Sequence, residues 1–365
     1  MYEQELLALK RSNRFRQREC YDENLIDLAS NDYLGFAEDR SLFEQAVREV
    51  EKYRYHAPRA SQLVNGYHPL HKEFEKYLCK INDFEAGIVV GSGFLANLSL
   101  IEALVRKKDI LILDEHYHAS GVMASKLVDA KVFYFKHNDA DDLRRILKNR
   151  NYQRAIVAVE GIYSMHGDLL NRDIFDVVQQ ENTILIVDEA HSSGVIGETL
   201  LGVFEYYEIE PKNNHIKMGT LGKAMGSYGA YILANKEIIS FLQNRAKAII
   251  YATAPSVFDI ALSFEGVKKS QKESRFLLES LESRKKIAAD IFGIDLDSAI
   301  LKLELKSSKK VMEIKSFALN EGYLIGAIRP PTVLSPMLRI ILRNSVSHDD
   351  IKYILVKLKE NYVFS

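Results

Sequence analysis

The sequence predicts an α/β protein with a doubly wound, mostly parallel sheet and a smaller α+β domain toward its C-terminal end. Three observations carry this prediction. Four short apolar runs lie between residues 87 and 187, longer amphipathic stretches separate them, and the pattern changes after Pro255. Parallel strands buried on both faces read as continuous apolar runs, and helices usually connect them. A chain of 365 residues is long enough for two or three structural units.

Domain boundaries follow from the changes of pattern along the chain. We expect an N-terminal segment over residues 1–44 that packs with the small domain, a large α/β domain over 45–256 and the small domain over 257–365. The first segment opens with a charged stretch, Glu3 to Arg18, that is typical of a short helix. A mitochondrial address is the alternative for this stretch, but its glutamates argue against that.

The strands of the large domain are predicted from the four apolar runs. They cover residues 87–90, 110–113, 155–159 and 184–187. The binding site of an open parallel sheet forms beyond the carboxyl ends of its strands. The residues that follow each run are therefore the candidates for function.

The C-terminal third is expected to hold one long helix and a small mixed domain. Residues 257–291 are charged at helical spacing, strand-like runs follow at 300–305 and 337–342, and a last helix covers 348–358. The lysines of the long helix raise nucleic-acid binding as an alternative. Glutamates are interleaved with them, which favours a solvated helix face.

Composition excludes several classes of protein. The 49 lysine and arginine residues nearly cancel the 50 acidic residues, so the net charge gives no indication of nucleic-acid binding. Cys20 and Cys79 have neither a metal-ligand nor a redox spacing, and no metal site is expected. No run approaches the roughly 18 apolar residues of a membrane span, and the N-terminus has no signal-peptide core. We therefore expect a soluble cytoplasmic protein.

Two of the apolar runs are followed by candidates for a phosphate site and a ring-stacking group. The first run leads into residues 91–94, Gly-Ser-Gly-Phe, and then into a helical pattern, so free backbone N–H groups there suit a phosphate. Asp114, His116 and His118 follow the second run. Taken singly, these residues are better explained as a simple turn and as solvated loop histidines.

An acid and a lysine are two further candidates for function. Asp188 ends the fourth run with His191 three residues on, and an acid at the end of a buried strand needs a fixed cationic partner. Capping of the next turn is the alternative for Asp188. Lys223 lies among small residues that leave room for a ligand, and a lysine that loses its proton can form a Schiff base. A Walker phosphate loop is excluded, because Ala224 stands where it requires serine or threonine.

These groups, in this order, are the set that a phosphorylated pyridine aldehyde requires. Such a cofactor needs a phosphate cradle, a group stacked on its ring, an anion for its ring nitrogen, a donor for its phenolic oxygen and an amine for its aldehyde. The sequence therefore predicts pyridoxal 5′-phosphate as the cofactor.

Several stretches also resemble one family, the α-oxoamine synthases. These are fold-type I pyridoxal-phosphate enzymes of the class II aminotransferase superfamily, and they join an amino acid to an acyl thioester with loss of carbon dioxide. The matching stretches are residues 31–35, 61–66, 92–97, 160–168, 188–197, 220–224, 251–253, 327–333 and 338–340. The resemblance implies an acyltransferase that works as a homodimer with shared active sites.

The resemblance also implies roles for single residues at the cofactor. Lys223 would hold the cofactor and move the Cα proton, and Asp188 would pair with the pyridinium nitrogen. His191 would bind the phenolic oxygen, His118 would stack on the ring, and Ser164 would lie beside it. The residues implied as phosphate ligands are Gly93, Phe94, Thr220 and, from the neighbouring subunit, Thr253.

The substrates implied by the resemblance are L-alanine and a pimeloyl thioester, condensed in biotin biosynthesis. Arg339 would bind the amino-acid carboxylate, and Arg329 and Asn31 would also contact substrate. Arg14 and Arg16 are both candidates for the acyl contact.

Several alternatives stay open beside this reading. The carrier of the acyl group is either coenzyme A or an acyl-carrier protein. Family members that use glycine, and make 2-amino-3-oxobutanoate or 5-aminolevulinate, are the first alternative function. A scaffold that has lost the reaction is the second, since Ala252 and His166 depart from the family pattern.

Overall fold

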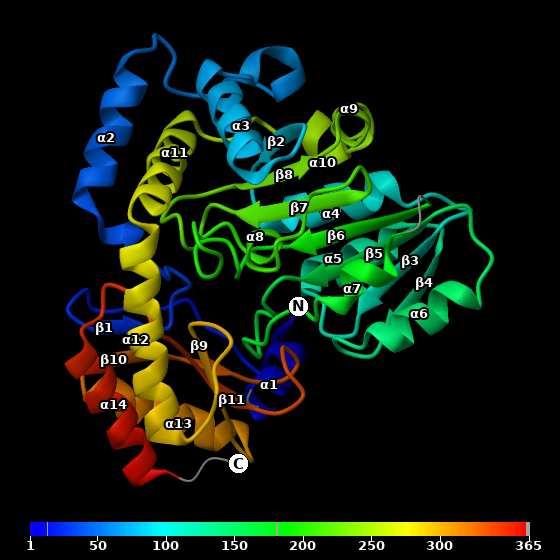
Figure 1. Cartoon of the computed structure of the whole chain (residues 1–365). Coiled ribbons are helices and arrows are strands. Elements are labelled where there is room, and N and C mark those ends of the chain that lie inside the picture. Colours follow the sequence, from blue (N-terminus) through cyan, green and yellow to red (C-terminus); the bar gives the residue numbers. More distant parts are fainter. Residues whose placement is uncertain (13, 180–181, 363–365) are drawn as a thin grey trace. The chain divides into compact units, whose positions relative to one another are not determined.

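The structure is a computed structural model that describes residues 1–12, 14–179 and 182–362 (Figure 1). Packing divides the chain into two compact units. The larger unit comprises Leu34–Ser164 and Leu169–Leu278, and the smaller unit comprises Met1–Tyr33, Met165–Asp168 and Glu279–Ser365.

The larger unit is built on a seven-stranded sheet with the order β2-β8-β7-β6-β5-β3-β4. All pairs from β7 to β4 are parallel, and β8 runs antiparallel to both of its neighbours. The strands are Ala86–Val90 (β2), Ile110–Asp114 (β3), Lys131–Phe135 (β4), Ala155–Glu160 (β5), Thr183–Asp188 (β6), His215–Thr220 (β7) and Ala230–Ala234 (β8). The predicted α/β class and four of these strands, β2, β3, β5 and β6, are confirmed.

Helices cover this sheet on both faces. Alternate strand residues, such as Leu111 and Leu113 of β3, form one buried cluster with α4, α9 and α10 (Figure 1). Ile112 between them is buried as well, which is why these strands read as unbroken apolar runs. The helices of this unit are Arg40–Glu51 (α2), Pro69–Asn82 (α3), Gly93–Leu104 (α4), Ala119–Ala124 (α5), Ala140–Lys148 (α6), Asp173–Val177 (α7), Val203–Tyr206 (α8), Lys236–Arg245 (α9), Lys247–Ile250 (α10) and Val257–Lys272 (α11).

The charged stretch 257–291 forms two helices rather than the single one expected. Helix α11 ends at Lys272, and α12, Ser274–Phe292, begins after the single residue Glu273. Helix α11 packs against α2 and α3, so residues up to Leu278 group with the large sheet. The packing division therefore differs from the ranges 1–44, 45–256 and 257–365, because α2 and α11 bury their apolar faces against each other.

The smaller unit contains a four-stranded sheet with the order β1-β10-β11-β9. Strand β1 is parallel to β10, and the other pairs are antiparallel. Its elements are Glu3–Arg11 (α1), Ile26–Leu28 (β1), Ile300–Glu304 (β9), Ser308–Asn320 (α13), Tyr323–Ile328 (β10), Met337–Ile341 (β11) and His348–Asn361 (α14). The N-terminal helix is shorter than expected, since it ends at Arg11. Across the described parts of both units, no helix has the length and apolar character needed to cross a bilayer.

A buried acid anchors the edge strand β2 just before the turn at residues 91–94. Glu75 of α3 accepts hydrogen bonds from the backbone N–H of Val89 at 2.9 Å and from the hydroxyl of Tyr67 at 2.5 Å. The backbone oxygen of Val89 accepts a hydrogen bond from the side chain of Gln62 at 2.6 Å. Side chains thus satisfy backbone groups of Val89 at this buried, unpaired sheet edge. Burial raises the pKa of Glu75 to about 7.

We expect Glu75→Gln to remove a pH-dependent part of the stability. The pKa of Glu75 in the folded protein is about 7, above the ordinary value of 4.5. The contribution of Glu75 to the free energy of unfolding is therefore complete below about pH 4.5 and is lost as the pH rises through about 7. Relative to the glutamine variant, the wild type should lose about 2 kcal/mol of unfolding free energy between pH 5 and pH 8. Denaturant unfolding at the two pH values measures this difference. Glu73→Gln, on the exposed side of the same helix, is the matched control and should leave the pH dependence unchanged.

Candidate active site

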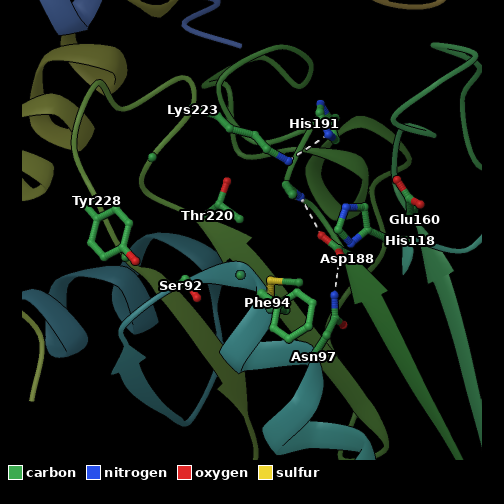
Figure 2. Close-up of a pocket in the computed structure, with 15 residues that line it drawn as sticks. Ser92, Phe94, Asn97, His118, Glu160, Asp188, His191, Thr220, Lys223 and Tyr228 are labelled. Atoms are coloured by element: carbon green, nitrogen blue, oxygen red, sulfur yellow. Dashed lines mark hydrogen bonds between the residues drawn. The ribbon is translucent and has the colours of Figure 1, made fainter. Parts of the chain in front are cut away.

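A cavity of about 240 Å³ lies at the carboxyl ends of the central strands of the large sheet (Figure 2). Seven of the predicted residues line it together, although they are spread over 131 positions of the chain from 93 to 223. The complete lining is Ser92, Gly93, Phe94, Asn97, His118, Glu160, Asp188, Ala190, His191, Met218, Thr220, Gly222, Lys223, Tyr228 and Gly229.

Lys223 and His191 form the reactive side of this cavity. The Nζ atom of Lys223 lies 2.7 Å from the Nε2 atom of His191 (Figure 2). Both residues follow strand ends: His191 lies three residues after β6, and Lys223 lies three residues after β7. An amine held beside an imidazole can be oriented and can exchange a proton.

Asp188 is the fixed anion of the cavity and is 4% exposed. Its Oδ2 atom accepts a hydrogen bond from the side-chain amide of Asn97 at 2.8 Å, and its Oδ1 atom accepts from the backbone N–H of Ala190 at 3.0 Å. Asn97 in turn accepts a hydrogen bond from the hydroxyl of Tyr117 at 2.6 Å. This network orients the carboxylate with neutral groups and leaves its charge available to a ligand.

His118 is the N-cap residue of helix α5, and its side chain is held by the first turn of that helix. Its Nδ1 atom lies 2.7 Å from the hydroxyl of Ser120 and accepts from the backbone N–H of the same residue at 3.2 Å. Burial lowers the pKa of His118, and the positive charge of Lys223 lowers it further, while Asp188 opposes both effects. A neutral imidazole can lie against a cationic aromatic ring without repulsion.

The other end of the cavity fits a phosphate. Ser92 caps the N-terminus of α4 by accepting a hydrogen bond from the backbone N–H of Leu95 at 3.3 Å, which leaves earlier N–H groups of the first turn for a ligand. The Thr220 hydroxyl is buried and has no hydrogen-bond partner among the described residues. A Cβ atom on Gly93 would lie 2.5 Å from Cγ2 of Thr220, so only glycine keeps this corner open.

We expect Gly93→Ala to weaken cofactor binding strongly. The added methyl group would overlap the Thr220 side chain and displace the hydroxyl that faces the predicted phosphate site. A loss of one or two charge-assisted hydrogen bonds would raise the dissociation constant of pyridoxal phosphate roughly 10- to 100-fold. Fluorescence or absorbance titration measures this. Gly91→Ala is the matched control, because its methyl group would meet only the flexible end of Leu95, at 3.3 Å.

The remaining predicted residues lie outside this cavity. Ser164 is buried, and its backbone N–H donates to Glu160 at 2.9 Å, whereas Thr253 is exposed. Arg339, Arg329 and Asn31 belong to the smaller unit. There the guanidinium of Arg339 donates to the Asn31 side-chain oxygen at 2.8 Å.

From the sequence alone, no role was assigned to three polar residues that line the cavity, Asn97, Glu160 and Tyr228. Asn97 lies on the first helical turns after the predicted phosphate site, and that position is a signal that could have found it. Glu160 is the last residue of β5 and directly follows the predicted run 155–159, but taken singly its meaning was ambiguous.

The residues present fit pyridoxal phosphate on the evidence of the structure itself. The cavity combines an amine, an oriented carboxylate, an imidazole face and a helix N-terminus. Two of its buried oxygens, Oγ1 of Thr220 and Oε1 of Glu160, have no hydrogen-bond partner within the described part of the chain. Buried polar atoms of this kind are normally satisfied, and here a bound ligand would satisfy them.

Comparisons with known proteins point to the same class of enzyme. The profile of the family "Aminotransferase class I and II" matches residues 23–358. An 8-amino-7-oxononanoate synthase from Helicobacter pylori strain J99 is 41% identical over 354 residues, which cover 96% of this chain and 95% of that protein. The solved structure of an 8-amino-7-oxononanoate synthase from Francisella tularensis has a TM-score of 0.79 at 26% identity and covers 94% of this chain and 100% of that one.

A second solved structure has the same fold at lower sequence identity. It is a serine palmitoyltransferase variant from S. paucimobilis with a bound PLP–myriocin aldimine. Its TM-score is 0.89 at 22% identity, and the match covers 98% of this chain and 96% of that one. The chain described here therefore belongs to the aminotransferase class I and II family, and it is a fold-type I enzyme whose cofactor is pyridoxal phosphate.

Proposed function

We propose that this enzyme condenses L-alanine with a pimeloyl thioester and releases carbon dioxide, a free thiol and 8-amino-7-oxononanoate, in biotin biosynthesis. The observation that carries the proposal is the pair of Lys223 and His191, 2.7 Å apart, in a cavity that also contains the oriented carboxylate of Asp188. The name of the Helicobacter pylori relative supports the choice of substrates.

Lys223 is the proposed base of the reaction. Pyridoxal phosphate, when bound, supplies an electron sink for the electron pair left on Cα of the amino acid. The Nζ atom of Lys223 takes the proton from Cα, and His191 keeps that nitrogen in position. A carbon–carbon bond then forms between Cα and the acyl carbon as the thiolate leaves. The original carboxylate departs as carbon dioxide, and Lys223 returns a proton to Cα.

Asp188 and His118 are proposed to hold the cofactor ring. The buried carboxylate of Asp188 would keep a proton on the ring nitrogen, which increases the capacity of the ring to accept electrons. His118 would lie on the ring face as a neutral imidazole, consistent with its lowered pKa. Gly93, Phe94 and Thr220 would bind the phosphate, with Ser164 close to the ring.

The carboxylate of alanine is assigned to Arg339. This residue lies on β11, is 5% exposed, and its guanidinium is held by the side chains of Asn31 and Tyr33 at 2.8 and 3.4 Å. A guanidinium in a fixed orientation can bind a carboxylate with two parallel hydrogen bonds.

We expect Arg339→Lys to raise the KM for alanine roughly 10- to 100-fold with a smaller change in kcat. Lysine keeps the charge but cannot reproduce the two-pronged geometry, and hydrogen bonds to charged groups contribute about 1.5–3 kcal/mol. Steady-state kinetics with alanine measures the split. Cofactor affinity is the internal control and should stay unchanged, because every residue of the cofactor cavity belongs to the larger unit.

A second, basic cavity in the smaller unit supports an acyl donor that carries its own carboxylate. Its volume is about 470 Å³, and its basic residues are Arg14, Arg16, Lys315 and Arg329. One acid, Glu19, accompanies them. The pimeloyl group ends in a carboxylate, and a surplus of cationic side chains would favour it over an uncharged acyl chain. Both N-terminal arginines line this cavity, so both remain candidates.

The proposed enzyme works as a homodimer. Thr253 is exposed and outside the cavity, as expected for a residue that serves the neighbouring subunit. The larger unit also exposes large apolar side chains that an interface would bury. They include Val64, Phe94, Met123, Leu127, Tyr228 and Tyr251. Analytical ultracentrifugation of the cofactor-loaded protein should give twice the mass of one chain, and a monomer would contradict this part of the proposal.

The decisive experiment is product identification by mass spectrometry. The enzyme is incubated with alanine or glycine and with pimeloyl, succinyl or acetyl thioesters. The pimeloyl thioester is offered on coenzyme A and on an acyl-carrier protein. We expect 8-amino-7-oxononanoate from alanine and the pimeloyl thioester. Condensation with glycine alone would replace this function by the glycine-using reaction, and no product from any pair would favour an inactive scaffold.

A further inference from the structure

Glu160 is a buried acid in the cofactor cavity that the proposed reaction does not use. It ends strand β5, in register with Asp188 at the end of β6, and it is 2% exposed. Its Oε2 atom accepts a hydrogen bond from the backbone N–H of Ser164 at 2.9 Å. Its Oε1 atom is buried and has no partner among the described residues. A carboxyl group that lines a cavity with one oxygen unsatisfied indicates a missing ligand atom.

The surroundings of Glu160 favour its neutral form. Burial is the largest effect that raises its pKa well above the ordinary value, and the charge of Asp188 is the next. Asp114, at the end of β3, acts in the same direction, whereas the hydrogen bond from the backbone N–H of Ser164 and the charge of Lys223 lower the pKa. Tyr117 also faces this group from the loop after β3. Two neighbouring carboxyl groups in a buried site rarely ionise together, and Asp188 is the one oriented by N–H donors.

The neutral form can donate a hydrogen bond into the cavity. Because Oε2 already accepts from the backbone of Ser164, the hydroxyl proton of the acid belongs on Oε1, the unpartnered atom. Glu160 is therefore a donor aimed at a ligand acceptor, whereas an ionised carboxylate at this place would repel an anionic oxygen.

The order of the strands indicates which acceptor this is. The phosphate end of the cavity is formed after β2 and β7, Asp188 lies on β6, and Glu160 lies on β5, one strand further from the phosphate end. In pyridoxal phosphate the phosphate arm and the phenolic oxygen lie on opposite sides of the axis through the ring nitrogen. With the phosphate near Thr220 and the nitrogen toward Asp188, the phenolic oxygen turns toward β5. Figure 2 places Glu160 beyond Asp188 and His118, on the side away from Ser92 and Thr220.

We propose that Glu160 is a cofactor-binding residue whose Oε1 hydroxyl donates a hydrogen bond to the phenolic oxygen of pyridoxal phosphate. It would share this oxygen with His191. The inference rests on the proposed placement of the cofactor in this cavity and is independent of the identity of the acyl substrate.

Two variants of matched size test the proposal. Glu160→Gln keeps an oxygen for the Ser164 N–H and an N–H₂ donor for the cavity, so cofactor affinity should stay within about threefold of the wild type. Glu160→Met has similar length and neither group, so the dissociation constant of pyridoxal phosphate should rise roughly 10- to 100-fold. Equal losses in both variants would mean that the site needs the carboxylate, and no loss in either would mean that Glu160 does not contact the cofactor. Each of these results overturns the proposal.

Infrared difference spectroscopy separates a ligand contact from a structural role. The spectrum with pyridoxal phosphate minus that without it should contain a shift of a protonated-carboxyl C=O band, and this band should be absent in Glu160→Gln. A wild-type spectrum without such a shift would contradict the proposal even if Glu160→Met binds weakly. Both measurements omit alanine and acyl thioesters. A failure of the proposed condensation therefore leaves them interpretable, and a failure here leaves the product assay unaffected.

Discussion

Lys223→Ala is expected to abolish covalent attachment of the cofactor and to reduce turnover by at least about 10²- to 10⁴-fold. The range is that of a lost general base alone, and loss of the covalent attachment adds to it. Small and apolar residues surround the amine of Lys223, and His191 lies 2.7 Å from it. No other lysine among the described residues lines the cavity, so none can replace Lys223.

Borohydride reduction followed by peptide mapping measures the attachment directly. In the wild type the label should be found on the peptide that contains Lys223, and the visible absorption band of the bound cofactor should disappear in the alanine variant. Lys236→Ala is the control, because Lys236 is an exposed lysine of the same unit and does not line the cavity. A label on another lysine in fully loaded enzyme would refute the assignment.

Asp188→Asn should lower kcat by about 10²- to 10³-fold while the protein still folds and binds cofactor. The substitution keeps the shape of the side chain and the acceptor for the Ala190 N–H, but it removes the charge that would keep the ring nitrogen protonated. Removing one preorganised electrostatic group from an active site typically costs about 3–4 kcal/mol. Single-turnover measurement of Cα deuterium exchange in alanine isolates this step from acyl transfer.

Asp114→Asn is a matched control for the loss of a buried carboxylate. Asp114 ends strand β3, two strands from β6 in the sheet, and is fully buried. It accepts hydrogen bonds from Tyr163 and His137 at 2.8 and 2.9 Å, but it does not line the cavity. Its replacement should reduce stability and leave deuterium exchange within about tenfold of the wild type. Equal losses of exchange in both variants would mean that Asp188 acts only through the fold.

Some strands were predictable because burial on both faces leaves a simple pattern. The runs at 110–113 and 155–159 contain only apolar residues, and they form the buried strands β3 and β5. Strand β4 was missed because it is an edge strand with exposed Lys131 and Tyr134. The run of β7 is interrupted by Lys217, which is nevertheless buried.

Lys217 illustrates why local patterns fail in such places. Its Nζ atom lies 3.6 Å from Glu189 and donates to the backbone oxygen of Leu201. A buried cation is tolerated only with partners of this kind, and these partners come from other parts of the chain. The break between α11 and α12 was also hidden from the local sequence pattern, because neither glycine nor proline marks it.

The amino-acid order by itself determined the class of the fold, the cofactor and seven of the fifteen residues that line its cavity, because a parallel sheet brings the ends of its strands to one edge. Only the tertiary structure decided how those residues are held. Asn97 binds the carboxylate of Asp188 across 91 positions of the chain, and the burial of Glu160 beside that carboxylate raises the pKa of Glu160. Charge state and orientation depend on the distances between side chains and on their exclusion from water, and both are properties of the packed molecule.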